Sequence, residues 1–218
     1  MPLAHGAWSL DPRRTALIVT DVQNDYTHPK GRMGRHLGAK ISRMRRILKP
    51  LRGLIARCKK RGARVVWIRS VRKAGDNEKE GHRIRPPWVF FREKTDWMGG
   101  PAEGSWGAEF APEVMPGPRD IVVRKRRHSA FYKSDLERVL RGLKVDTLLF
   151  AGIATYACVE ASLRDAFFRD FDVVLVADCC AASNLPMHKA TLRLVRNLYG
   201  AVAPSKTIAA KLRRTRSR

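Results

Sequence analysis

Continuous apolar runs alternate along this chain with longer segments in which apolar residues recur at helical spacing. The run at 15–20 (TALIVT) is followed at once by Asp21, a pattern that predicts a buried strand. From 40 to 61 apolar side chains form one helical stripe, which Gly62 ends. The same patterns predict strands at 64–69, 120–123, 147–153, 172–177 and 201–202, and helices at 134–143, 156–169, 187–199 and 206–212.

Strands rich in Val, Ile and Leu that alternate with helices are typical of a parallel sheet buried on both faces. We therefore predict an α/β fold, a doubly wound three-layer α/β/α arrangement with a six-stranded parallel sheet, spanning 1–218 as one domain. In the strand order 3-2-1-4-5-6 the first and fourth strands are neighbours, which places Asp21 and Cys158 together at the switch point. Lys125, on the third strand, would start two strands, about 10 Å, from Asp21, and its long side chain must close that gap.

The segment at 76–119 breaks this rhythm. It holds six of the 12 prolines, six glycines, and the aromatic residues Trp88, Phe90, Phe91, Trp97 and Trp106. A loop of this length is a lid, a binding loop or an inter-subunit arm, or else a surface excursion packed by its own aromatic residues. Because so much apolar area must be covered, we predict a homo-oligomer in which this segment is buried at an interface and borders the Cys158 pocket.

The charge balance is strongly basic. Lys and Arg number 44 against 20 Asp and Glu, which gives a net charge of +24, and the C-terminal tail at 211–218 adds five of the basic residues. Such a charge could attract nucleic acid or anionic surfaces non-specifically. The alternative is a basic bias that decorates helix surfaces, and we favour it because no helix-turn-helix, zinc or RNA-binding aromatic pattern accompanies the charge.

Composition also narrows the class of protein. A hydrophobic fraction of 44% excludes global disorder, and the apolar runs are much shorter than the roughly 20 residues of a membrane span. The first residues lack a signal-peptide pattern, so we expect a cytoplasmic location. The four cysteines are too few and too irregularly spaced for a disulfide framework or a CxxC zinc site.

Three reactive side chains follow three of the predicted strands: Asp21 after the first, Lys125 at the third and Cys158 after the fourth. Parallel α/β sheets bind ligands at the carboxyl ends of their strands, so an acid, an amine and a thiol share one edge. In the first turn of a helix, beside a lysine, the pKa of the Cys158 thiol would fall. An Asp within reach could accept the thiol proton. On position alone Cys158 could also be a small core residue, as we interpret Cys58. We interpret Cys179 and Cys180 as core or pocket-wall residues.

Three segments, TALIVTDVQNDY, VVRKRRHSAF and AGIATYACVEASLRDAFF, resemble the signature segments of the isochorismatase-like cysteine hydrolases. The likeness extends in order over about 13–212 and includes VVLVADCC and His188. It implies Asp21 as general base, Lys125 as electrostatic partner and Cys158 as nucleophile. It also implies a non-proline cis peptide bond between Ile153 and Ala154, which would direct the backbone N–H groups of Ala154 and Cys158 at an oxyanion.

Departures from the family pattern narrow the range of reactions and substrates that we expect for this chain. Nicotinamidases carry an Asp-x-His metal motif and a further His, whereas here only His82 is available, so we predict no metal and no cofactor. Isochorismatases of the vinyl-ether type usually lack the thiol. The segment GIATYACVEASLRDAFFRDF is similar to ureidoacrylate- and biuret-type members, although Tyr156 replaces an Asn or Asp and His128 an aromatic residue. Members of the family are dimers or tetramers, which the resemblance implies here too.

We expect the pocket wall to consist of Gln23, Tyr26, His128, Phe131 and Tyr156. Gln23 and His128 could hold a polar ureide or carboxylate, and we interpret His188 as a surface or capping residue. The leading hypothesis is a metal-independent cysteine amidohydrolase that acts on a small amide, ureide or N-carbamoyl compound. The alternatives are an isochorismatase- or nicotinamidase-type hydrolase, and a basic protein that binds nucleic acid on a hydrolase-like scaffold.

Overall fold

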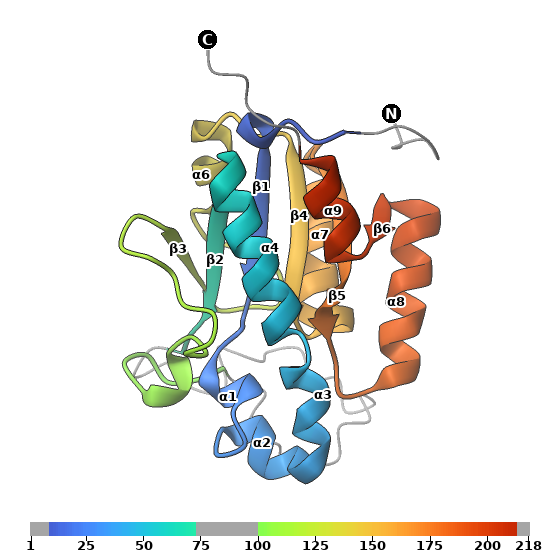
Figure 1. Ribbon diagram of the computed structural model, residues 1–218. Helices are drawn as coiled ribbons and strands as arrows, with labels where there is room; N and C mark the ends of the chain where they lie inside the picture. The colour runs from blue at the N-terminus through green and yellow to red at the C-terminus, as the bar shows by residue number, and fades with distance from the viewer. Residues whose placement is uncertain (1–8, 73–99, 213–218) are drawn as a thin grey trace.

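The computed structural model describes residues 9–72 and 100–212. Its centre is a six-stranded sheet in the order β3-β2-β1-β4-β5-β6, in which every neighbouring pair is parallel (Figure 1). The strands are β1 (Thr15–Thr20), β2 (Arg64–Ser70), β3 (Ile121–Lys125), β4 (Thr147–Ile153), β5 (Asp172–Ala181) and β6 (Ala201–Ala203). The predicted α/β class, parallel sheet and strand order are therefore confirmed.

Helices cover both faces of the sheet. Against one face lie α4 (Leu48–Arg61) and α9 (Ser205–Lys211), and against the other lie α6 (Leu136–Gly142), α7 (Glu160–Phe167) and α8 (Leu185–Leu198) (Figure 1). Successive strand residues enter opposite cores: Leu17 and Val19 join the α4 side, whereas Ala16 and Ile18 join the α7 side. Because both faces of the sheet are buried in this way, successive positions of such a strand are apolar and the sequence of the strand is a continuous apolar run.

The predicted helix at 40–61 is divided in the structure. The chain runs through α1 (Asn24–Thr27), α2 (Arg32–Leu37), a 3-10 turn η2 (Gly38–Ile41) and α3 (Ser42–Arg45) before α4 begins at Leu48. Pro50 explains the restart, because it lacks an N–H and is tolerated only in the first turn of a helix. The predicted end of the helix is confirmed, since Gly62 adopts a left-handed conformation with φ of 83°.

The sheet is irregular where β4 meets β5. Phe150 pairs with Leu175, but Gly152 pairs with Cys180, so β5 is longer than the predicted strand at 172–177. Gly152 has a φ of +123°, and a Cβ there would lie 2.0 Å from the carbonyl oxygen of Thr20. Only glycine fits this position, which allows the ends of β1 and β4 to approach each other closely.

Part of the segment at 76–119 is described, from residue 100 onward. It contains a 3-10 turn η3 (Trp106–Ala108), and Phe110 from it packs against Trp67 of β2 with ring centroids 5.3 Å apart. Trp106 is half exposed and contacts the ring of His28. Four aromatic residues of the predicted interface, together with the expected lone histidine and most of the basic tail, lie outside the described residues: Trp88, Phe90, Phe91, Trp97, His82 and 213–218.

The described helices are too short or too polar to cross a membrane.

Candidate active site

Asp21, Lys125 and Cys158 converge at the carboxyl edge of the sheet. The Lys125 Nζ lies 2.8 Å from Asp21 Oδ2, 3.1 Å from Cys158 Sγ and 2.9 Å from the carbonyl oxygen of Arg127. The side chains of Lys125 and Asp21 are only 1% and 2% exposed. The long lysine side chain therefore spans the end of β2 and closes the gap between β3 and β1, as the strand order required.

The turn after β1 aims the Asp21 carboxylate. Asp21 has a left-handed backbone with φ of 53°, and its N–H donates to the carbonyl oxygen of Ile68 in β2. Its own carbonyl oxygen accepts from the N–H of Gln23 at 2.8 Å. Aspartate is one of the few non-glycine residues that adopt this conformation readily. The strand end thus turns sharply and leaves the carboxylate facing Lys125.

Cys158 lies on a π-helical turn, η4 (Thr155–Val159), which precedes α7. The prediction of one regular helix over 156–169 missed this turn. The carbonyl oxygen of Ala154 accepts from the N–H groups of Ala157 at 3.0 Å and Val159 at 3.3 Å. The expected cis peptide bond between Ile153 and Ala154 is present. Single π turns are common at functional sites, where they widen a helix around a reactive residue.

Burial dominates the electrostatics of these three groups. Cys158 as a residue is half-buried, and the loss of solvation around its sulfur raises the pKa of the thiol to about 12. This effect outweighs the attraction of Lys125, and the Asp21 charge raises the pKa further. The prediction that the lysine and the helix start give a net lowering of this pKa is therefore wrong. Burial also raises the pKa of Asp21, although Lys125 acts to lower it.

Lys125 keeps its charge in this setting. Burial acts to lower its pKa, but the negative charge of Asp21, joined by that of the Cys158 sulfur whenever the thiol is ionised, outweighs that effect and holds the pKa above its usual value. The cluster therefore combines a fixed ammonium group with a thiol and a carboxyl group of raised pKa. A thiol proton can move to the carboxylate inside this enclosed site, which is the requirement for a cysteine nucleophile activated by a neighbouring base.

A model of the isochorismatase domain matches residues 15–207 of the chain. The chain belongs to the isochorismatase family. Ureidoacrylate amidohydrolase RutB of Methylobacterium radiotolerans is 33% identical over 202 residues, covering 89% of this chain and 78% of that protein. A cysteine hydrolase from Pseudomonas syringae pv. phaseolicola superposes with a TM-score of 0.77 at 24% identity, covering 94% and 95% of the two chains. N-carbamoylsarcosine amidase from Thermoplasma acidophilum gives 0.68 at 24% identity, covering 88% and 96%.

Two of the five predicted pocket-wall residues lie near Asp21, Lys125 and Cys158. His128 is exposed, and its Nδ1 lies 3.5 Å from Cys158 Sγ. Tyr26 is half-buried, and its phenol lies within electrostatic range of the same groups: the loss of solvation raises its pKa, and the charges of Asp21 and Cys158 raise it further. The structure therefore brings His128 and Tyr26 together with the three predicted catalytic residues.

The other three pocket-wall residues are placed elsewhere. Gln23 is buried, with Nε2 donating to the carbonyl oxygens of Ser70 and Ala108 and Oε1 accepting from the Ser70 N–H. All its strong hydrogen-bonding groups are thus used within the protein, so it braces the strand ends and does not face a ligand. Phe131 is a core residue whose ring lies 6.2 Å from that of Phe171.

Tyr156 points away from the thiol. Its hydroxyl lies 3.5 Å from Ser183 Oγ, and its side chain lines a groove of about 540 Å³ between η4 and α8. The prediction for Tyr156 came from the family resemblance, in which this position borders the pocket.

His188 is also placed differently from its prediction. It is 6% exposed, and its Nδ1 lies 2.8 Å from the hydroxyl oxygen of Thr155 at the start of η4. The sequence held a usable signal, because His188, Thr191 and Val195 recur at helical spacing and are all buried. The remaining cysteines, Cys58, Cys179 and Cys180, are buried as predicted.

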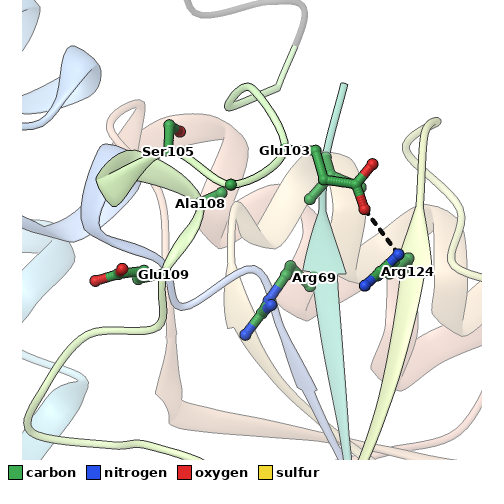
Figure 2. A pocket seen from close by; sticks show the side chains of 8 residues that line it. Arg69, Glu103, Ser105, Ala108, Glu109 and Arg124 are labelled. Carbon is green, nitrogen blue, oxygen red and sulfur yellow. Dashed lines mark ion pairs between the residues drawn. The ribbon is translucent and has the colours of Figure 1, made fainter. Parts of the chain in front are cut away.

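A second pocket, of about 280 Å³, lies on the face of β3 that carries Arg124, opposite to the face that carries Lys125 (Figure 2). Its rim holds an ion pair in which Arg124 Nη1 lies 2.7 Å from Glu103 Oε1, and Arg69 stacks over the ring of Phe110. Three of the four charged residues that line it are thus paired or stacked, and the fourth is Glu109. Over residues 9–72 and 100–212, no group of three or more His, Cys, Asp or Glu side chains is arranged to hold a metal ion.

Proposed function

We propose that the chain is a cysteine amidohydrolase that cleaves a C–N bond of a small amide, ureide or N-carbamoyl compound through a thioester, without a metal ion. The observation that carries this proposal is the enclosed cluster itself, in which one ammonium group lies 2.8 Å from a carboxylate and 3.1 Å from a thiol. The names of the relatives support it: one is a ureidoacrylate amidohydrolase and another an N-carbamoylsarcosine amidase.

The first half-reaction forms the thioester. As the Cys158 sulfur attacks the substrate carbonyl, its proton passes to Asp21, so that no thiolate has to persist in the buried site. The negative charge that develops on the carbonyl oxygen is stabilised by the N–H groups of Ala154 and Cys158. Asp21 then gives the proton to the departing nitrogen, the C–N bond breaks, and ammonia or an amine leaves.

The second half-reaction reverses these proton movements. A water molecule attacks the thioester carbonyl and loses its proton to Asp21. The C–S bond breaks, the product leaves as an acid, and the proton returns to the sulfur. Lys125 stays protonated throughout and stabilises the charge on whichever of its two neighbours is ionised at that stage. Atoms and protons balance, with one water consumed for each bond cleaved.

The test is a screen of about twenty small amides, ureides and N-carbamoyl acids for ammonia release, repeated with Cys158→Ala and Cys158→Ser. Both variants are expected to lose at least about 10³-fold in kcat, because the group that forms the covalent bond is removed or replaced by a far weaker nucleophile. Cys58→Ala is the matched control, because it removes a thiol that is buried in α4 among core residues. A Cys158→Ala variant that kept most of the wild-type activity would show that the covalent mechanism is wrong.

A further inference from the structure

The turn that carries Cys158 is tied to one helix on both sides of the nucleophile. Thr155, three residues before Cys158, lies 2.8 Å from His188 Nδ1 through its hydroxyl oxygen. Glu160, two residues after Cys158, accepts through Oε2 from the Thr191 hydroxyl at 2.5 Å. His188 and Thr191 both belong to α8 and are three positions apart, so they project from the same side of that helix.

These contacts are shielded from water. Thr155, His188 and Thr191 are all buried, and the Glu160 side chain is 14% exposed. Burial and the nearby positive charge of Arg46 lower the pKa of His188, so its imidazole is neutral near pH 7. A buried hydrogen bond that loses one partner leaves the other partner unsatisfied, which is unfavourable. The four side chains therefore hold a defined arrangement.

Within the part of the chain that the structure describes, few other side-chain hydrogen bonds hold this turn, although Glu160 also pairs with Arg164. No side chain caps the start of η4, and its first backbone bonds converge on the single carbonyl oxygen of Ala154. On the other side, Ser162 Oγ donates to the Cys158 carbonyl oxygen at 2.7 Å. The distance from Sγ to Lys125 Nζ is 3.1 Å. A displacement of about 1 Å at such a distance can lower a catalytic rate 100-fold.

We propose that His188 and Thr191 are positioning residues, which hold the Cys158 turn against the Asp21–Lys125 pair. Neither residue contacts the reacting atoms; each acts through a residue that flanks the nucleophile. The catalytic consequence rests on the proposed cysteine amidohydrolase function, whereas the effect on the turn itself does not. Loss of either contact therefore loosens the turn, which lowers kcat and opens the thiol to solvent.

The decisive variants are His188→Leu and Thr191→Val, which remove the hydrogen bonds and keep most of the side-chain volume. We expect kcat to fall about 10-fold with KM within about 2-fold, because a positioning defect acts on the reacting geometry. We expect His188→Asn and Thr191→Ser, which retain a polar atom near the same place, to recover most of the rate. Lys189→Ala, at an exposed position of α8, is the matched control.

Alkylation by iodoacetamide, mapped by mass spectrometry, reports on the turn without any substrate. In His188→Leu, Cys158 should be labelled several-fold faster than in the wild type, while the fully buried Cys58 stays unlabelled. Parallel labelling of Cys58 would mean general unfolding and would overturn the proposal, as would wild-type kcat and wild-type labelling of Cys158. If His188→Leu does not fold, Thr155→Val removes the same hydrogen bond from the other side. If no substrate is found, the proposed function fails, but the labelling experiment still decides this inference.

Discussion

Lys125 and Arg124 are consecutive residues of β3, and each pairs with a carboxylate at nearly the same distance. Lys125 lies 2.8 Å from Asp21, and Arg124 lies 2.7 Å from Glu103. Strand geometry sends the two side chains to opposite faces of the sheet. The Lys125 and Asp21 side chains are 1% and 2% exposed, whereas those of Arg124 and Glu103 are 65% and 32% exposed.

The comparison teaches that the environment of an ion pair, more than its length, decides what the pair can do. Water screens the Arg124–Glu103 pair, so its contribution to stability is about 0–1 kcal/mol. The enclosed pair cannot exchange one partner for water, and breaking it by removing one side costs about 3–5 kcal/mol. The same enclosure changes the pKa of Asp21, Lys125 and Cys158, which makes that pair suitable for moving protons.

The largest effect is expected from Lys125→Met. The variant removes the charge that stabilises Asp21 and the sulfur, so turnover should fall at least about 10³-fold. It also leaves Asp21 buried without its partner, which should lower the free energy of unfolding by about 3 kcal/mol, measured by urea denaturation. Arg124→Met is the control on the same strand. Similar losses in the two variants would contradict the assigned role of burial.

Asp21→Asn tests the proton acceptor of the enclosed pair. The amide keeps the shape of the carboxylate but cannot take the thiol proton, so kcat should fall about 10²- to 10⁴-fold. Glu103→Gln makes the same chemical change in the exposed pair and should leave kcat unchanged. Ammonia release measures both. Asp21 is not the base if its variant is as active as the Glu103 variant.

A third prediction concerns the acidic side of the pH profile. Activity needs the ionised form of Asp21, and burial raises the pKa of this carboxyl group above its ordinary value of 3.8. kcat/KM should therefore decline as the pH falls, with a midpoint above 3.8. Circular dichroism at each pH must show that the protein remains folded. A profile that stayed flat down to pH 3.8 in folded protein would contradict the raised pKa.

Changes to the exposed pair should have small effects. In Arg124→Gln, kcat should stay within about 2-fold of the wild type and the free energy of unfolding should change by at most about 1 kcal/mol. Any stability difference should shrink in high salt, which screens exposed charges. A larger change that persists in high salt would indicate that the pocket in Figure 2 has a role of its own.

The smallest expected effect is that of chelation. The proposed mechanism uses only protein groups and water, so prolonged treatment with EDTA should leave ammonia release unchanged. The comparison is the untreated enzyme in the same buffer. Loss of activity that zinc or iron restored would show that a metal ion takes part.

Features that follow from the backbone path could be predicted from the sequence. Because strand ends meet at one edge of a parallel sheet, the pattern placed Asp21, Lys125 and Cys158 together, and the structure brings them into contact. Features that depend on side-chain direction could not be predicted from the sequence. Nothing in the sequence indicates that backbone groups of Ser70 and Ala108 use the hydrogen-bonding capacity of Gln23.

The other differences between the sequence-based predictions and the structure also have physical causes. The direction of the Cys158 pKa shift depends on how fully the folded chain encloses the sulfur, and position near a helix start does not reveal this. The division of the helix at 40–61 was foreseeable, because Pro50 is visible in the sequence. The burial of His188 was also within reach, since its spacing places it on the inner face of α8. The cis peptide bond was expected from the family resemblance alone.

The position of β1 in the middle of the sheet has a consequence for how the protein is made. Its neighbour β4 comes far later in the chain, and Arg14 and Asp146, which pair just before these two strands, are 132 positions apart. Contacts between such distant segments form slowly, because a long loop must close before they can stabilise anything. During synthesis, the edge of β1 that pairs with β4 therefore stays unpaired until β4 has left the ribosome. Chaperones that shield strand edges during that interval should raise the yield of folded protein.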